Sequence, residues 1–540
     1  INTVSCQSKG KTKSWLMLFI YKQLYMINIK YTFFIFILLT ISAQAQEYSW
    51  VQSYPLDYNM NPAMIQTATA TDGDDHVYLW TMRNFSHIYG STVFGDLALI
   101  KYDVDGNEVY SKTIYGYGSI ITMKDDGQKY IYLLGTMRTN LNFWGSVIMG
   151  HGGGGYEVEY FLARINPQGE PELMLNIDGL FNKTVSSVYT FDFNNQGNIL
   201  LAWSSTSVSY LTEISVEGDS LSSIVQDKVP LISSIATNNV GEIFTTGSCA
   251  SPGALFAGVN YEPEFGYNRY IAKYSADKEV QWVKYVEDVT CNFPIVQCDD
   301  NGNVYWADLL HLETQFGNYS VSGPQWVYDY FLAKLDASGN YMWVKEIPLQ
   351  NQVSGDASLG TYHSMIIDNE GNPVLCGFQR GIIDWGNGVV SNAETYYDYF
   401  LIKYDADGEV IWVKNGGGEG YDVYHEMAIT SHGSIYASGI AHDTIYLDNI
   451  VHHEDGWLYP VLVRLDEQTT AVSGNQLEKE DNGLLLYPNP ATGIVNCQLS
   501  TVNFQKVDIY DSYGRLIMNV FEGKTSGQDV VFDVSGLPSG

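Results

Sequence analysis

The sequence has few cysteines, few cations and no long apolar run, and each shortage excludes a class of protein. Six cysteines are scattered through 540 residues without a C-x-x-C pair, so neither a disulfide framework nor a thiolate zinc site is indicated. Lys and Arg number 28 against 61 Asp and Glu, which gives a formal net charge of -33. Such an acidic chain repels a phosphate backbone, so we expect no nucleic acid among its partners.

The N-terminal segment carries the features of an export signal. A basic start over residues 26–30 precedes an apolar run over 33–41 and an A-x-A site at 43–45. We predict a signal peptide over 26–45, and we interpret residues 1–25 as an upstream segment foreign to the native chain. The apolar run is too short for a comfortable membrane span. We expect no transmembrane segment after signal cleavage.

The remaining cysteines do not form an obvious set. Beyond the predicted signal peptide they are five, an odd number. Cys291 and Cys298 are the pair that an oxidising compartment would join, while buried free thiols are the alternative that we favour.

The sequence contains an internal repeat. Its composition is rich in aromatic residues and glycine, as is typical of β-structure with tight turns. The segment Tyr330–Lys345 recurs as Tyr399–Lys414, with the pattern Y-F-L-x-K-x-D-A-x-G-x-x-x-W-V-K. Weaker copies give a period of about 60 residues. The equivalent positions are Lys101, Arg164, Glu213, Lys273, Lys334, Lys403 and Arg464.

A second signature alternates with the first. It is an apolar strand, a turn rich in Asn and Asp that ends in Gly, and another strand. Each repeat therefore predicts four antiparallel strands, and such units around a ring are typical of a β-propeller. Seven copies predict seven blades, with turn glycines at 73, 127, 197, 241, 302, 371 and 433.

The last repeat lacks its fourth strand, and the start of the mature chain supplies a candidate. The segment Tyr48–Gln52 matches the Trp-Val-Lys pattern of the fourth strands. We predict that it completes the seventh blade of a propeller spanning 46–470, because this closure removes an exposed sheet edge. The third blade, around Gly197–Ser220, is compressed.

The segment Asp329–Trp343 resembles the seven-bladed propeller repeats of bacterial surface proteins. The resemblance implies a scaffold at the cell exterior. It implies no catalytic residue, because the repeat specifies architecture and not chemistry.

The C-terminal segment has a different pattern. A polar linker over 471–482 leads into a segment, 483–540, with the blocks Leu484–Gly493, Val507–Arg515 and Asp533–Gly540. Alternating apolar residues and turn signals predict a small partial β-sandwich. The blocks resemble the C-terminal sorting domain of the type IX secretion system. The resemblance implies the type IX machinery as partner and a secreted or cell-surface location, and we interpret the domain as truncated because the family pattern continues past the final Gly.

No motif of catalysis or metal binding is complete. G-x-S-x-G, H-E-x-x-H and a phosphate-binding glycine loop are absent from the sequence. The run His452–Asp455 is a weak metal candidate, because adjacent residues of a strand point to opposite faces. The Asp-x-x-Gly turns lack the rest of a calcium loop. We predict no cofactor, no metal and no catalytic residue.

One feature in phase with the repeat predicts a ligand site. Cations stand at the exits of the second strands, where we expect the loops of one rim to gather. An anionic ligand, such as an acidic glycan, is the hypothesis that this placement suggests. The alternative is that each cation pairs with a neighbouring loop carboxylate. The five residues are Arg83, Arg138, His311, Arg380 and His442.

The sequence thus favours an exported, non-catalytic binding protein whose propeller recognises a glycan or a surface protein. A glycan-processing hydrolase or lyase is the second interpretation, and a carboxylate pair in the central pocket would favour it. A structural or adhesin module without a small-molecule site is the third.

Overall fold

The computed structural model describes most of the chain between residues 14 and 533. The described ranges are 14–23, 32–41, 45–56, 65–73, 76–89, 92–150, 158–249, 252–287, 293–310, 313–322, 329–346, 355–361, 363–386, 388–455, 458–468, 484–487, 494–499, 506–510, 516–522 and 530–533. The chain divides into a smaller unit of Ile1–Gln46, Asn387–Val389 and Glu467–Gly540 and a larger unit of Glu47–Gly386 and Val390–Asp466. The structure is almost entirely β, which confirms the predicted all-β class.

The smaller unit contains two antiparallel sheets. Strand β1 (Ser14–Gln23) pairs with β2 (Thr32–Ile41) and with β42 (Lys506–Tyr510), which pairs with β43 (Leu516–Glu522). The second sheet contains β40 (Leu484–Tyr487), β41 (Ile494–Leu499) and β44 (Val530–Asp533). In the full chain, part of the predicted signal peptide is therefore strand β2. Its removal on export stays a prediction.

The larger unit is built from successive groups of four antiparallel strands. One long strand, β8, is the last strand of the first group and the first strand of the second, so the two groups form one sheet. The first group contains β4 (Thr67–Thr71), β5 (Val77–Met82), β7 (Thr92–Tyr102) and β8 (Glu108–Asp125). The second continues with β9 (Ile131–Met137), β12 (Glu159–Ile165) and β13 (Pro171–Asn176).

The next three groups repeat this order. In the third group only two residues, Thr206 and Ser207, join the second and third strands, which explains the compressed repeat. The groups are β14 (Ser187–Phe193), β15 (Ile199–Ser205), β16 (Val208–Ile214) and β17 (Ser220–Asp227); β18 (Ser234–Thr237), β19 (Ile243–Cys249), β22 (Asn268–Tyr274) and β23 (Val280–Glu287); and β24 (Ile295–Cys298), β25 (Val304–Leu309), β28 (Tyr330–Leu335) and β29 (Tyr341–Glu346).

The last two groups depart from the simple order. One has a first strand in two pieces, and the other takes a strand from the start of the chain. The sixth group contains β30 (Gly355–Leu359), β31 (Met365–Ile367), β32 (Pro373–Gly386), β33 (Val389–Tyr404) and β34 (Val410–Gly416). The last has the order β35 (Val423–Ile429), β36 (Ile435–Ala441), β39 (Tyr459–Gln468) and β3 (Ala45–Ser53).

Short hairpins extend the connections between second and third strands. Two of them pair with the last strand of the preceding group, β10 with β8 and β20 with β17. The hairpin strands are β6 (His87–Tyr89), which pairs with β7, β10 (Leu141–Phe143) with β11 (Ser146–Ile148), β20 (Leu255–Phe256) with β21 (Val259–Asn260), β26 (Glu313–Phe316) with β27 (Tyr319–Ser322), and β37 (Thr444–Leu447) with β38 (Ile450–His453). A short helix, α1 (Ile177–Phe181), follows β13.

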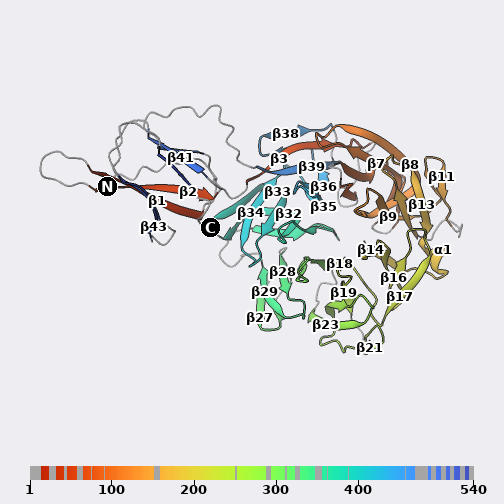
Figure 1. Ribbon diagram of the computed structural model, residues 1–540. Helices are drawn as coiled ribbons and strands as arrows, with labels where there is room; N and C mark the ends of the chain where they lie inside the picture. Colours follow the sequence, from red (N-terminus) through yellow and green to blue (C-terminus); the bar gives the residue numbers. More distant parts are fainter. Residues whose placement is uncertain are drawn as a thin grey trace. The chain divides into compact units, whose positions relative to one another are not determined.

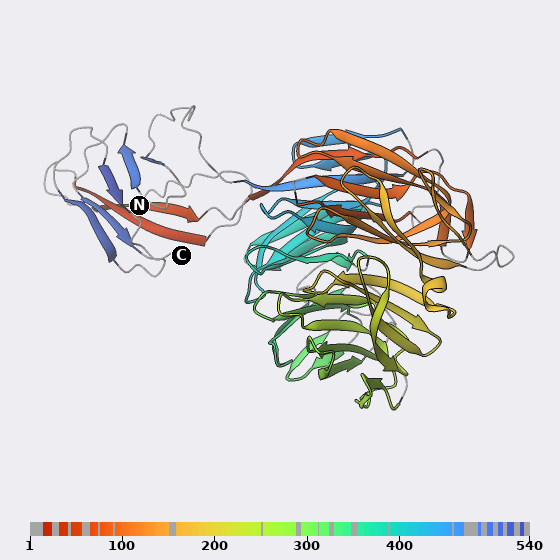
Figure 2. The ribbon, with the colours of Figure 1, turned by 45° about the vertical axis from the view of Figure 1, so that its right-hand side comes forward.

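The groups follow one another in chain order, as the colours of Figures 1 and 2 show, and their first strands contact one another. Strand β4 contacts β8, and the contacts continue from β8 through β14, β18, β24, β31 and β35, which contacts β4. Apolar side chains fill the space between neighbouring sheets. Tyr399 of β33, for example, stacks on Tyr424 of β35 with 4.1 Å between ring centroids. The arrangement resembles that of a β-propeller.

A repeated pair of hydrogen bonds joins each of several groups to the next. In the fifth group, Lys334 Nζ and Trp343 Nε1 both donate to the Ala406 carbonyl oxygen at 3.0 Å. Lys273 and Trp282 of the fourth group donate to Ala337 in the same way, at 3.0 and 3.2 Å. The repeat-phased cation and tryptophan therefore fix these groups on the turns of their neighbours.

The same pair joins the last group to the first. Trp50 Nε1 on β3 donates to the Val104 carbonyl oxygen at 3.0 Å, and Arg464 on β39 donates to that oxygen too. The Trp50 ring lies 6.3 Å from the Tyr102 ring and 5.7 Å from the Tyr436 ring, measured between centroids. Trp50 thus occupies the place of a fourth-strand tryptophan.

The third group replaces this contact with a reversed ion pair. Glu213 stands where other groups have a cation, and Lys278, in the turn of the next group, pairs with it. Lys278 takes the turn position that elsewhere belongs to Gly, with φ of 67°. Burial alone would raise the pKa of Glu213, but hydrogen bonds from Lys278, Asn198 and Ser222 lower it to about 2.

Among the described residues Cys249, Cys298 and Cys376 are free thiols, and Cys291 lies outside them. Burial raises the pKa of the Cys298 and Cys376 thiols well above the usual range. No helix in the described part of the chain is long and apolar enough to span a membrane.

We predict that Trp50→Ala lowers the free energy of unfolding by about 2–4 kcal/mol, because it removes a ring from between two groups together with its hydrogen bond. Urea denaturation followed by circular dichroism measures the loss. Trp343→Ala, at an equivalent contact, should lose a similar amount.

Met342→Ala is the matched control, because this exposed side chain precedes Trp343 on the same strand. Its effect should remain within about 0.5 kcal/mol. If Trp50→Ala were as mild as this control, β3 would not join the last group to the first.

Candidate functional site

The structure places three of the five sequence-predicted cations directly after the ends of second strands. Arg83 follows β5, Arg138 follows β9 and His442 follows β36. Arg380 lies within the long strand β32. His311 lies outside the described residues.

Arg83 and Arg138 lie at the junction of the first two groups. The Arg83 Nη1 donates to Thr113 Oγ1 of β8 at 2.5 Å. The Arg138 backbone N–H donates to the Tyr117 carbonyl oxygen at 2.9 Å, and the Arg138 guanidinium lies 4.5 Å from the centroid of the Tyr89 ring. A cation over a ring face is a favourable electrostatic contact.

A chain of contacts through Tyr397 and Asp422 connects Arg380 with His442. The Arg380 guanidinium bonds to Asp356 at 2.6 Å and lies 5.6 Å from the Tyr397 ring centroid, with 51 % of its side chain exposed. The Asp422 backbone N–H donates to the Tyr397 carbonyl oxygen, and Asp422 Oδ1 accepts from the His442 backbone N–H, both at 2.8 Å. For Arg380, pairing with a neighbouring carboxylate is therefore a feature of the structure.

Asp422 sits in an apolar environment. Burial, with a contribution from nearby Asp398, raises the pKa of Asp422 to about 7, although the backbone N–H groups of His442 and Gly418 oppose the shift. Its carboxyl group accepts hydrogen bonds from the backbone N–H groups of Gly418, which follows β34 of the sixth group, and of His442 in the last group.

Exposed tyrosines surround the first pair of cations. Tyr89, Tyr115 and Tyr117 are 47, 56 and 42 % exposed. Tyr115 lies on β8 opposite Asn142 of β10, and Tyr117 adjoins Arg138. We call Arg83, Tyr89, Tyr115, Tyr117 and Arg138 the tyrosine–arginine patch. Its ring faces and guanidinium groups combine apolar contact with hydrogen-bond donors.

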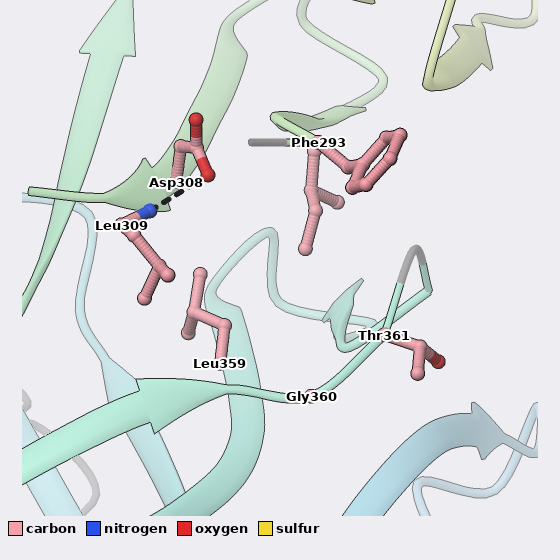
Figure 3. A pocket seen from close by; sticks show the side chains of 7 residues that line it. Phe293, Asp308, Leu309, Leu359, Gly360 and Thr361 are labelled. Atoms are coloured by element: carbon pink, nitrogen blue, oxygen red, sulfur yellow. Dashed lines mark hydrogen bonds between the residues drawn. The ribbon is translucent and has the colours of Figure 1, made fainter. Parts of the chain in front are cut away.

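An apolar pocket of about 190 Å³ opens at another place on the larger unit. Figure 3 shows Leu309 and Leu359 with their side chains turned toward each other, and Phe293 and Thr361 farther along the wall. Asp308 lines this pocket but bonds to the buried Arg269 at 2.8 Å. The pocket therefore presents mainly an apolar surface.

A second cavity, of about 250 Å³, is lined by the first strands where they contact one another. We call it the first-strand cavity. Its titratable lining comes from β8, β14, β35 and the segment between β30 and β31. These residues are Lys124, Asp125, Asp192, His363 and Glu426.

The cavity shifts the protonation of its lining. Burial raises the pKa of Glu426 to about 8, although the charge of Lys124 opposes the shift. Burial raises the pKa of Asp125 to about 6. Burial, helped by the charge of Lys124, lowers the pKa of His363 well below its usual value. Glu426 and His363 are therefore both uncharged at neutral pH.

The run His452–Asp455 lies on and after β38. His453 bonds to Asp443 at 3.0 Å and to Asp455 at 3.4 Å, and His452 lies 3.8 Å from Glu454. Within the described ranges, no group of three or more His, Cys, Asp and Glu is arranged to hold a metal ion.

Sequence reasoning missed the tyrosines of the patch and the lining of the first-strand cavity. The tyrosines could not be distinguished from the many packing tyrosines of the repeat. Glu426 carried a signal, because a carboxylate inside a predicted innermost strand is costly to bury. A second signal was the set of extra residues between Leu359 and Met365, because they bring His363 into the cavity.

Comparison with known proteins identifies the end of the chain. Residues 485–540 match the family described as the secretion system C-terminal sorting domain. This segment is a type IX sorting domain. The sorting domain implies the type IX secretion machinery as partner and places the protein outside the outer membrane, secreted or at the cell surface. It covers only the smaller part of the chain and describes nothing about the repeats. No curated protein matches the chain.

Solved structures similar to this chain share little sequence with it. The WD40 domain of Neurospora crassa Pan2 is 10 % identical, with 81 % of this chain and 98 % of that chain covered and a TM-score of 0.40. A protein of unknown function from Bacteroides caccae is 13 % identical, with 62 % and 94 % covered and a TM-score of 0.31. A member of the DUF4221 family from Bacteroides vulgatus is 10 % identical, with 78 % and 98 % covered and a TM-score of 0.32. At these TM-scores the likeness carries no conclusion about this chain.

We predict that stability falls as the pH rises from about 6.5 to 8.5, where Glu426 is protonated in the folded state and ionised in the unfolded one. The folded pKa of Glu426 is raised, so its contribution is complete below the unfolded pKa and disappears as the pH passes about 8. The loss should be about 2 kcal/mol, measured by urea denaturation at both pH values.

Glu426→Gln is the control, because it keeps the shape of the side chain and removes its titration. Most of the pH dependence over this range should vanish in this variant. An equal slope in both proteins would assign the effect to other groups, of which Asp422 is the first candidate.

Proposed function

We propose that the larger unit is a seven-bladed β-propeller closed by β3. The sequence repeat supports this count, and so do the contacts of first strands that run from β4 to β35 and back to β4. The position of β3 beside β39, together with the Trp50 and Arg464 hydrogen bonds to Val104, supports the closure. Four-stranded blades around a ring leave their loops free for binding.

We propose that the protein is an exported, non-catalytic binding protein whose ligand contacts the tyrosine–arginine patch. One observation carries this proposal. Three exposed tyrosines and the ring-stacked Arg138 lie together at the junction of two groups. Tyr and Arg are the residue types that dominate binding energy at recognition surfaces.

A glycan is the ligand class that the patch favours. A sugar ring presents one face of C–H groups, which an exposed tyrosine ring can cover, and hydroxyl groups at its edge. The Arg138 guanidinium lies over the Tyr89 ring, and a guanidinium is a group whose N–H donors suit hydroxyl or carboxylate oxygens. The cations Arg380 and His442 and the sequence-predicted His311 are not needed for this contact, and their part in ligand binding stays a prediction.

A glycan-processing hydrolase or lyase is the alternative. The observation that favours it is the group of carboxyl side chains, Asp125, Asp192 and Glu426, in the first-strand cavity, with the pKa of Glu426 raised as a general acid requires. The five residues of the patch include no carboxylate, which is why we place binding before catalysis.

Binding of the purified full chain to an array of neutral and acidic glycans tests the proposal, with bound glycans also assayed for cleavage. We expect saturable binding without turnover, weakened at least tenfold by Arg138→Ala and by Tyr89→Ala. Each change removes one partner of the ring–guanidinium contact.

Tyr267→Ala is the matched control, because Tyr267 is 61 % exposed and lies outside the patch. It should leave glycan binding unchanged. Turnover of a bound glycan would favour the hydrolase. Absence of glycan binding would overturn the glycan proposal and leave a protein ligand or a structural module.

A further inference from the structure

The first strand of the sixth group leaves its sheet for several residues. Gly360 N–H donates to the Cys376 carbonyl oxygen at 3.0 Å, and Cys376 N–H donates to the Ser364 carbonyl oxygen at 2.9 Å. Both ends of the excursion therefore bond to the same residue of β32. In three other first strands the register shifts by one residue, at Ile121, Tyr189 and His425. Bulges of this kind redirect side chains and are frequent beside functional sites.

This excursion brings His363 into the first-strand cavity. Thr361 anchors the segment on the last group, because its N–H and its hydroxyl both donate to the His425 carbonyl oxygen at 3.1 Å. His363 is buried and lines the cavity together with Glu426 of the adjacent strand β35. The departure from the repeat thus adds a polar side chain to an interior space.

Several buried polar atoms at this cavity have no hydrogen-bond partner in the protein. They are both carboxyl oxygens of Glu426 and Nε2 of His363. Both side chains line the cavity and are buried. A buried polar group without a partner costs about 1–3 kcal/mol, so these atoms require a polar occupant of the cavity.

The charges of the lining restrict that occupant. Lys124 Nζ lies 3.3 Å from Asp192 Oδ1, and Asp125 Oδ1 accepts from the Gly127 backbone N–H at 3.0 Å. An anion in the cavity would meet the carboxylates of Asp125 and Asp192. A cation would meet the ammonium group of Lys124. The unpartnered atoms themselves belong to uncharged donors and acceptors.

The volume admits more than isolated water molecules. An engineered apolar cavity of about 150 Å³ accommodates benzene, and this cavity measures about 250 Å³. A six-membered ring that carries hydroxyl groups therefore fits the space and matches the lining. Lys124 and Asp192, each about one-fifth exposed, lie on its solvent side.

We propose that the first-strand cavity is a second binding site, separate from the tyrosine–arginine patch, for a neutral polyhydroxy ring the size of one sugar residue. Glu426 and His363 supply its hydrogen bonds, and the departure of the first strand from its sheet brings His363 into it. The proposal does not depend on glycan binding at the patch.

Titration of the purified full chain with glucose, galactose and myo-inositol, followed by isothermal calorimetry and ligand-detected NMR, tests this site. We expect saturable binding of at least one of these probes. His363→Phe, which fills the cavity, should weaken binding at least tenfold. Glu426→Leu, which replaces the buried carboxyl group of the lining with an apolar group of similar volume, should weaken it at least severalfold and guards against misfolding of the first variant.

Arg138→Ala is the control that separates the two sites, since it should leave binding of the three probes unchanged. If no probe bound, the cavity would hold water alone and the proposal would be wrong. Binding that survived both cavity variants would also overturn it, and binding lost in Arg138→Ala would assign the probes to the patch. Failure of the glycan array alone would affect only the patch.

Discussion

Each four-stranded group has apolar faces, and the neighbouring groups are what cover them. A sheet of this size is not stable by itself, so the contact between groups is the interaction on which the rest depends. The repeat-phased cation and tryptophan, such as Lys334 and Trp343, bond to the turn of the next group, while first strands pack against each other. The cavity between first strands and the patch at a group junction both exist only because neighbours meet.

The strand pattern was predictable because the repeat states it several times. In the last repeat, the predicted turn glycine at 433 lies between β35 and β36, and the repeat position Arg464 lies on β39. The match of Tyr48–Gln52 to the fourth-strand pattern pointed to β3 from a distance of about 400 residues along the chain. The sorting domain was equally readable, since its blocks are specific.

The candidate sites were predictable only in part. Arg83 and Arg138 were found because cations are scarce and stand in phase with the repeat. Tyr89, Tyr115 and Tyr117 were missed, because exposure depends on hairpins such as β10–β11 that fold onto the preceding group. The pairing of Arg380 with Asp356 depends on a strand register that no single segment encodes. His363 enters a cavity through an irregular segment, and irregularity has no pattern to recognise.

The reversed ion pair of Glu213 and Lys278 affects how the similar groups of this chain dock in the correct order during folding. Similar repeats are prone to docking in the wrong place during folding. If the fourth group docked after any group that presents a lysine or arginine, Lys278 would face a like charge instead of Glu213. This ion pair of reversed sign therefore favours docking of the fourth group on the third group over docking on a group that presents a cation.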